Sequence, residues 1–163
     1  MIHTPLRTAG SMRNALRAGV AALLIAAPGT APAQTISDFA LVDGATIYLA
    51  VLPAEMLRTY PAGSEESRMH GGVPDGKHVH HVQTALFDML TNARISDARV
   101  SATVSEPGLA GSRAKLEPFL VGGALTYGGY FEFQKRDLYQ IRVTAELPDD
   151  GRILEKTFEY RHQ

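Results

Sequence analysis

The chain of 163 residues contains no cysteine and no tryptophan. The absence of cysteine excludes disulfide bonds, thiolate nucleophiles and thiolate metal ligands. Any bound metal ion must therefore be held by histidine, methionine or carboxylate side chains. The chain also has no basic run or basic patch, so binding to nucleic acid or to an anionic membrane surface is not expected.

An apolar run at residues 18–27 is far too short to span a bilayer. The segment before it has no acidic residue and three basic ones, Arg7, Arg13 and Arg17. The small-residue sequence Ala31-Pro32-Ala33 follows. This order is typical of a cleaved signal peptide. We therefore predict a signal peptide at residues 1–33, cleavage before Gln34 and export to a bacterial periplasm, with an uncleaved N-terminal membrane anchor as the alternative.

The exported chain would have about 130 residues, which is enough for one domain with its own core. Loss of the three arginines lowers the formal net charge from −1 to −4. No cysteine follows the cleavage site, so a lipoprotein anchor is excluded. We expect residues 34–45 to be a lead-in segment and residues 46–163 to form the domain.

Most of this domain is predicted to be β-strand. Residues 46–52 read as a buried strand and residues 78–89 as a second strand. Residues 98–104 and 139–147 alternate strictly between apolar and polar side chains, as half-buried antiparallel strands do. Residues 53–58 could form one helical turn, and residues 59–68 read as a loop.

Two further patterns complete the expected fold. The strand at residues 115–121 contains Pro118 and is expected at a sheet edge, whereas Gly122-Gly123 and Gly128-Gly129 predict turns. About seven strands with almost no helix indicate an antiparallel β-sandwich of immunoglobulin-like type. Tyr139, near the start of its strand, resembles the residue of a tyrosine corner. A small barrel is the competing architecture.

The chemistry of the chain is concentrated in residues 69–81, which hold four of the six histidines. Glycine and proline between His70 and His78 predict a chain reversal that brings the two ends of the stretch together. The candidate metal ligands are Met69, His70, His78, His80 and His81.

Strand periodicity sorts these ligands into faces. His78 and His80 share one face, and His81 points to the other. Mixed imidazole and thioether ligands favour copper, especially Cu(I), whereas zinc would accept the histidines alone. Glu65 or Glu66 could add an oxygen ligand. His162, next to the C-terminus, is expected to be frayed. In the alternative reading the histidines are solvated polar residues and Met69 belongs to the core.

No enzyme signature is present. The sequence has no Gly-x-Ser-x-Gly elbow, no His-Glu-x-x-His and no phosphate- or dinucleotide-binding glycine loop. The expected mature N-terminus is Gln34 rather than histidine, so a terminal amine cannot join an imidazole on copper. We therefore expect a protein that is not an enzyme.

Several short motifs resemble a known family, the periplasmic iron-transport accessory proteins. The motifs run from Met69-His70 to Leu147 and include Leu116-Glu117-Pro118-Phe119, Tyr127-Gly128-Gly129-Tyr130 and Tyr139-x-Ile141-x-Val143. The resemblance implies an immunoglobulin-like, copper-binding homodimer that works beside a membrane metal transporter.

The resemblance also implies ligands at positions where this chain departs from the family. The family's methionine ligand falls at Phe119 or Leu120, and its histidine before the Tyr-Gly pair falls at Thr126. Met69 and His70 carry over directly, and the histidines at 78, 80 and 81 would be replacements or a different site. We thus expect a periplasmic copper-binding carrier or transport accessory. The alternative is a metal-free module that docks another envelope protein through a sheet edge or loops.

Overall fold

A computed structural model describes residues 36–163 except residue 62, with side chains for the same residues except 36, 37, 65, 66 and 69. The predicted signal peptide lies outside the described residues. Eight strands form the fold: β1 (Ile36–Val42), β2 (Ala45–Pro53), β3 (Val79–Asp88), β4 (Arg99–Ser105), β5 (Ser112–Val121), β6 (Ala124–Glu132), β7 (Leu138–Glu146) and β8 (Ile153–Arg161). Three short helical segments lie between β2 and β3: α1 (Ala54–Leu57), α2 (Glu65–Arg68) and η1 (Met69–Gly71).

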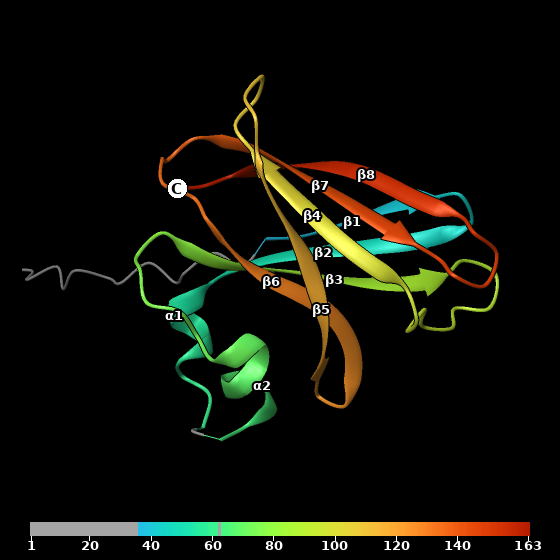
Figure 1. Ribbon diagram of the computed structural model, residues 1–163, viewed down its shortest axis with the longest axis horizontal. Helices are drawn as coiled ribbons and strands as arrows, with labels where there is room; N and C mark the ends of the chain where they lie inside the picture. Colours follow the sequence, from blue (N-terminus) through green and yellow to red (C-terminus); the bar gives the residue numbers. More distant parts are fainter. Residues whose placement is uncertain (1–35, 62) are drawn as a thin grey trace, which may run out of the picture. The chain divides into compact units, whose positions relative to one another are not determined.

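All strand pairs are antiparallel, and the strand order is β1-β2-β3-β6-β5-β4-β7-β8 (Figure 1). Strand β5 belongs to two layers, because residues 112–116 pair with β4 and residues 117–121 pair with β6. The outermost strands β1 and β8 also contact each other, so the sheet is nearly closed. The predicted all-β sandwich is confirmed, with one strand more than expected and some character of the barrel alternative.

Two details of the strand prediction were wrong. Pro118 is not at an edge, because it pairs with Tyr127 of β6 in the middle of the strand order. Gly128 and Gly129 do not form a turn but lie inside β6, whereas Gly122 and Gly123 do form the turn between β5 and β6, with φ of +56° and +80°. The expected lead-in segment contains β1, which pairs along its whole length with β2.

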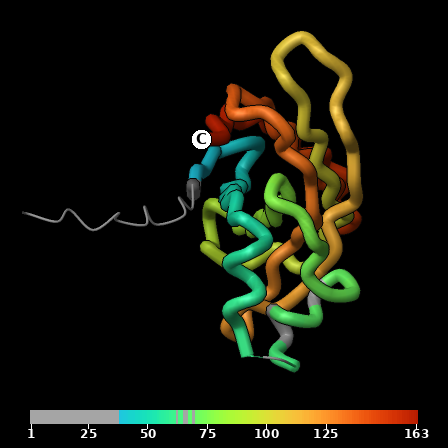
Figure 2. The backbone as a smooth tube through the Cα atoms, turned by 90° about the vertical axis from the view of Figure 1, so that its left-hand side faces the viewer, coloured from blue at the N-terminus to red at the C-terminus, as the bar shows by residue number. Residues whose placement is uncertain are grey.

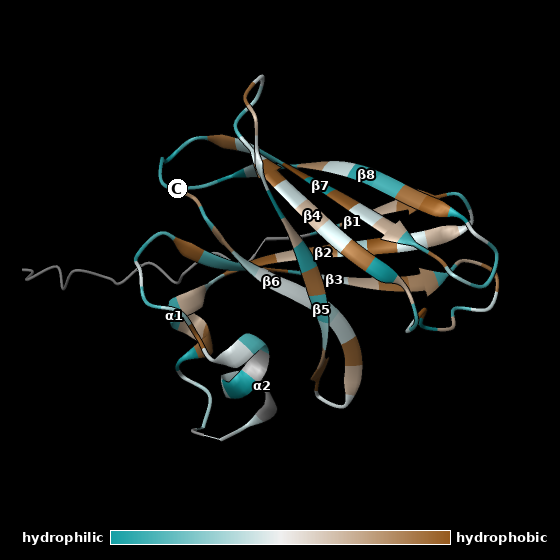
Figure 3. Cartoon of the chain, viewed as in Figure 1, coloured by the Kyte–Doolittle hydropathy of each residue, from teal (hydrophilic) through white to brown (hydrophobic). Residues whose placement is uncertain are grey.

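The core lies between the two layers and follows the predicted alternation. On β7 the buried side chains are Tyr139, Ile141, Val143 and Ala145. The intervening residues face outward, and the polar hairpin that joins β7 to β8 stands out as hydrophilic in Figure 3. Strand β8 is at one end of the strand order, as the outward break at Lys156 predicted.

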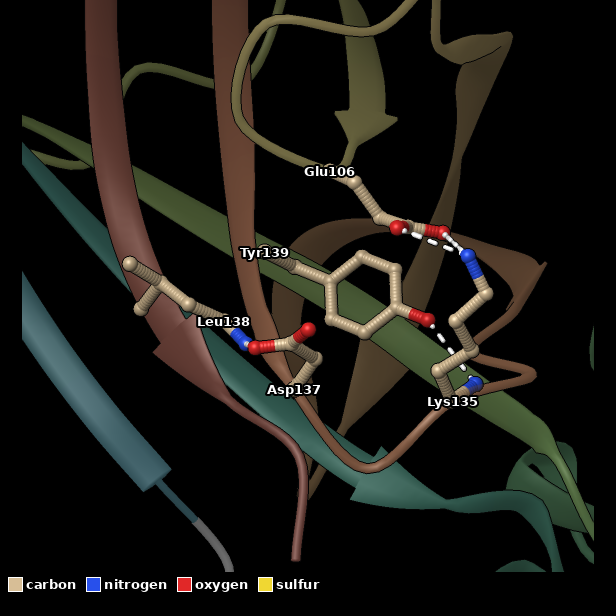
Figure 4. A network of polar contacts seen from close by, with 5 residues as sticks. All are labelled: Glu106, Lys135, Asp137, Leu138 and Tyr139. Carbon is tan, nitrogen blue, oxygen red and sulfur yellow. Dashed lines mark hydrogen bonds and ion pairs between the residues drawn. The ribbon is translucent and has the colours of Figure 1, made fainter.

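A tyrosine corner holds the start of β7. The hydroxyl oxygen of Tyr139 accepts a hydrogen bond of 3.0 Å from the backbone N–H of Lys135 (Figure 4). The Lys135 ammonium in turn binds the Glu106 carboxylate at 3.0 Å, and this hydrogen bond raises the pKa of Lys135. The corner predicted from the sequence is therefore present, and it links the β6–β7 loop to the loop after β4.

The chain between β2 and β3 forms a small helical lobe on one side of the strands (Figure 2). Helix α1 contacts β2 and β3, and α2 contacts β5. The sequence predicted the turn of α1 but a plain loop at residues 59–68, where α2 begins. No helix in residues 36–163, residue 62 apart, is long and apolar enough to cross a membrane.

Candidate metal site

The histidine stretch enters β3 with its side chains divided between two faces. His80 and Val82 face the core side, whereas His81 faces the outer side of the sheet, as period-two alternation requires. His78 precedes the strand and is exposed. The structure therefore places His80 and His81 in different environments, although they are adjacent in the sequence.

His81 is fully buried, although it lies on the outer face of its sheet. Tyr130 of β6 is its direct cross-strand partner, and the two ring centroids are 5.0 Å apart. Phe119 of β5 packs edge-on at 5.2 Å. Gly128 lies beneath the imidazole: a Cβ atom there would be 2.5 Å from Nε2 of His81. The missing side chain of Gly128 is what gives the ring its space.

His70 covers His81 from the helical lobe. Its backbone is in the left-handed region, with φ 52° and ψ 30°, and this conformation interrupts η1. Its ring centroid is 5.3 Å from that of His81, and the rings are inclined at 32°. Phe119 and Tyr130 flank His70 as well, at 5.4 Å and 5.9 Å. The reversal predicted between His70 and His78 thus brings His70 onto β3, but next to His81 rather than His80.

The polar atoms of this cluster are buried without partners. Nε2 of His70, Nδ1 and Nε2 of His81 and the hydroxyl of Tyr130 have no hydrogen-bond partner among the described residues. A buried donor or acceptor without a partner costs about 1–3 kcal/mol. Four such atoms in one place indicate that the cluster is built to receive a ligand.

Burial sets the charge state of both rings. It lowers the pKa of His81 from 6.5 to about 3, and the neighbouring His70 lowers it further. Burial also lowers the pKa of His70, against the opposing effect of the Glu117 carboxylate. Both imidazoles are therefore neutral at physiological pH, which is the form that coordinates metal ions.

The spacing of the two rings also suits a shared ion. Metal–nitrogen bonds of about 2.0–2.1 Å at a tetrahedral angle place two coplanar-bonded imidazole centroids roughly 5 Å apart, and the observed separation is 5.3 Å. Among the described residues, however, no group of three or more His, Cys, Asp or Glu side chains is arranged to hold a metal. The histidine pair fits a metal ion as two ligands, and further ligands must come from elsewhere.

The remaining predicted ligands are distributed as follows. The Met69 backbone opens η1 directly before His70, but its side chain and those of Glu65 and Glu66 lie outside the described set. His80 is 3% exposed and packs against Phe133 and His162. The stretch thus supplies two separate histidine clusters instead of the single site that the sequence suggested.

Sequence reasoning missed three contributors to the His70–His81 cluster. Gly128 was taken for a turn residue, Tyr130 for an ordinary strand residue, and Glu117 was not considered. The motif Tyr127-Gly128-Gly129-Tyr130 was noticed and did carry the signal. Phe119, where the resemblance implies a methionine ligand, contacts both histidine rings, and its cross-strand partner is Thr126, where the resemblance implies a histidine. The family's two missing ligand positions therefore adjoin this cluster.

The fold and this cluster define a class: an antiparallel β-sandwich with a buried histidine pair on the outer face of one sheet. No protein-family model matches the chain, and no curated protein matches it significantly. Solved structures do match. A copper-bound variant of FetP from uropathogenic Escherichia coli strain F11 superposes with a TM-score of 0.59 at 13% identity, covering 78% of this chain and 95% of that chain.

Two further structures are similar. FetP of the same strain as isolated gives a TM-score of 0.57 at 12% identity, over 78% of this chain and 94% of that chain. A DUF4426 family protein from Pseudomonas aeruginosa gives 0.56 at 12% identity, over 77% and 93%. The resemblance to iron-transport accessory proteins inferred from the sequence is confirmed at the level of the fold.

Proposed function

We propose that this protein is a periplasmic transition-metal-binding protein, with copper as its metal, that acts as a carrier or as an accessory to metal transport. The observation that carries the proposal is the pair His70 and His81, whose buried ring nitrogens face each other's surroundings without hydrogen-bond partners. A metal ion would satisfy nitrogens that no described protein group satisfies. FetP, of similar fold, has been crystallised with copper bound.

The chemistry of the donors favours copper. Imidazole nitrogen binds copper and zinc alike, whereas a thioether favours Cu(I). The sequence puts Met69 directly before His70, and we propose its sulfur as the soft ligand. The aromatic rings of Phe119 and Tyr130 beside the histidines keep water away from one side of the ion. With few protein ligands, the ion would remain exchangeable, as a carrier requires.

We propose binding rather than catalysis. Tyr130 and Phe119 fill the space beside the histidine pair, and the neutral rings offer no charged acid or base for a reaction. The partner in this proposal is a membrane metal transporter or another envelope protein. A homodimer, as the family resemblance implies, belongs to the same proposal.

A metal-free interaction module is the second candidate. Phe39 and Leu41 of β1 are each 60% exposed, and Tyr48 of β2 stands beside Phe39 with ring centroids 5.8 Å apart. Exposed apolar side chains on an end strand suit docking by strand addition or by surface contact. This surface lies on strands that do not carry the histidine pair, so the two candidates can be tested separately.

Metal titration of the protein expressed from its full-length coding sequence tests the proposal. After treatment with a chelator, it should bind Cu(II) and, under reducing conditions, Cu(I) with sub-micromolar affinity. His70→Ala should weaken this binding at least tenfold, since His70 supplies one of two imidazoles. His78→Ala is the matched control, because His78 is exposed on the same segment and should leave the affinity at this site unchanged.

Two outcomes would refute the proposal. The first is copper binding no tighter than that of an unrelated protein with surface histidines. The second is equal loss of affinity in His70→Ala and His78→Ala. Substitution of Phe39 and Leu41 by serine should leave metal binding intact and would impair only a docking function.

A further inference from the structure

The second histidine cluster lies on the other face of β3, at the end of the core. His80 is 3% exposed and contacts three rings: Phe133 at 5.0 Å, Tyr160 at 6.3 Å and His162 at 4.7 Å. His162 follows the last strand and was expected to be frayed. Instead its backbone N–H donates a 2.9 Å hydrogen bond to the carbonyl of Asp137, which holds the chain end beside β3.

A hydrogen bond fixes the tautomer of His80. Its Nδ1 is 3.2 Å from the backbone carbonyl of His78. A carbonyl oxygen only accepts, so Nδ1 must carry the proton and donate it. Nε2 of a neutral His80 is then left with a free lone pair. An Nδ1–H bonded to a backbone carbonyl is the usual arrangement that orients a histidine whose Nε2 binds a metal.

The His162 ring has the position of a second ligand. Its plane is inclined at 82° to that of His80, with the centroids 4.7 Å apart. Two imidazoles bound side by side to one ion, with bonds of about 2.0–2.1 Å, have centroids roughly 4.5–5 Å apart. No hydrogen bond to the His162 ring occurs within the described residues, so its nitrogens are not committed to another protein group.

The surroundings permit a cation. Burial lowers the pKa of His80 and of His162, so both rings are neutral and able to coordinate. The Glu55 carboxylate of α1 acts on His80, and the Arg136 guanidinium acts on His162. These opposite charges offset one another. The exposed imidazole of His78 is close enough to interact with both rings electrostatically.

We propose that His80 and His162 form a second metal site, separate from the His70–His81 pair, that takes a divalent ion suited to imidazole ligands, such as Zn(II) or Cu(II). The fold supplies two ligands, and water or the exposed His78 side chain completes the coordination. Because β3 directs His80 and His81 to opposite faces, the two sites do not share an ion. With only two fixed ligands, the second site binds more weakly than the first and exchanges its ion readily.

Zn(II) titration of the chelator-treated full-length protein tests this inference, with stoichiometry and the imidazole nitrogen resonances as readouts. The wild-type protein should bind two equivalents. His162→Ala should lose the weaker one and keep the tighter one, and Zn(II) should shift the Nε2 resonance of His80 only when His162 is present. His162 lies beyond the last strand, so its replacement should leave the melting temperature nearly unchanged. His162→Gln, which keeps a polar side chain, guards against any packing effect.

The two sites are distinguished by their variants. His70→Ala should remove the tighter equivalent and leave the His80 resonance responsive to Zn(II). If the only equivalent bound is lost in His162→Ala and not in His70→Ala, the second site stands and the proposed function at His70 and His81 fails. An unchanged second equivalent in His162→Ala, or a wild-type protein without one, would overturn the second site.

Discussion

The imidazole of His81 lies directly over the Cα atom of Gly128, so closely that a Cβ atom on Gly128 would be 2.5 Å from Nε2 and Cε1 of the ring. The two residues lie on adjacent strands of one sheet, and both face outward. Any residue other than glycine at position 128 would displace the histidine. The cradle thus depends on a residue that contributes no side chain of its own.

Gly128→Ala should therefore reduce copper affinity at least tenfold and lower the free energy of unfolding by about 1–3 kcal/mol, as overpacking in a close-packed region does. Calorimetric metal titration and urea denaturation measure the two effects. Gly129→Ala is the matched control. Its Cβ would meet the side chain of Leu116 at 3.2 Å on the core side, so stability should fall while copper affinity stays the same. Equal losses of affinity in both variants would refute the cradle.

The low pKa of His81 predicts a dependence of stability on pH. Its folded pKa of about 3 is below the unfolded value of 6.5, so the unfolded chain takes up a proton first as the pH falls. The stability is therefore complete above pH 6.5 and is lost progressively below it. The metal-free protein should lose about 2 kcal/mol between pH 7 and pH 5 from this group.

Urea denaturation at both pH values, with chelator present, measures this loss. His81→Phe removes the titrating group and should reduce the difference between the two pH values by about that amount. His70 and His80 change stability in the same direction, because burial lowers their pKa values too, and their share should persist in the variant. An unchanged pH dependence in His81→Phe would show that His81 does not stay neutral when buried.

Two tyrosines on β6 should respond oppositely to loss of their hydroxyl groups. The Tyr130 hydroxyl is buried without a described partner, so Tyr130→Phe should raise the free energy of unfolding by about 1 kcal/mol in the metal-free protein. The Tyr127 hydroxyl accepts a 3.1 Å hydrogen bond from the buried N–H of Ala98. Tyr127→Phe should therefore cost about 1–3 kcal/mol. Thermal denaturation of the pair checks the sign, and a destabilised Tyr130→Phe would contradict the assignment.

The tyrosine corner makes a separate prediction. Tyr139→Phe removes the acceptor for the Lys135 N–H and should lower the free energy of unfolding by about 1 kcal/mol. Copper affinity should not change, because the corner lies at the start of β7 and none of its residues touches His70 or His81. Lys135→Met is a useful comparison: it removes only the exposed ion pair with Glu106, which should contribute 1 kcal/mol or less. A larger loss in Lys135→Met than in Tyr139→Phe would refute this ranking.

The alternation of apolar and polar residues was enough to predict most strands. It placed the buried face of β7 correctly and put His80 and His81 on opposite faces, because side-chain direction along a strand depends only on local geometry. The same local reasoning failed at Pro118 and at Gly128-Gly129. Proline and glycine are read as edges and turns when the partner strand is unknown, and here β5 changes layers at its proline while β6 uses its glycine to admit a histidine.

The sequence by itself determined that the protein is all-β, has no thiolate chemistry and concentrates its histidines in one stretch. Only the tertiary structure decided which histidines meet. His70 reaches His81 because a left-handed turn and the helical lobe fold over the outer face, and His162 reaches His80 because β8 ends beside the start of β3. Both pairings join residues through contacts between strands and loops that the sequence does not encode as local patterns, so the period of a strand reveals the face of a side chain but not its partner.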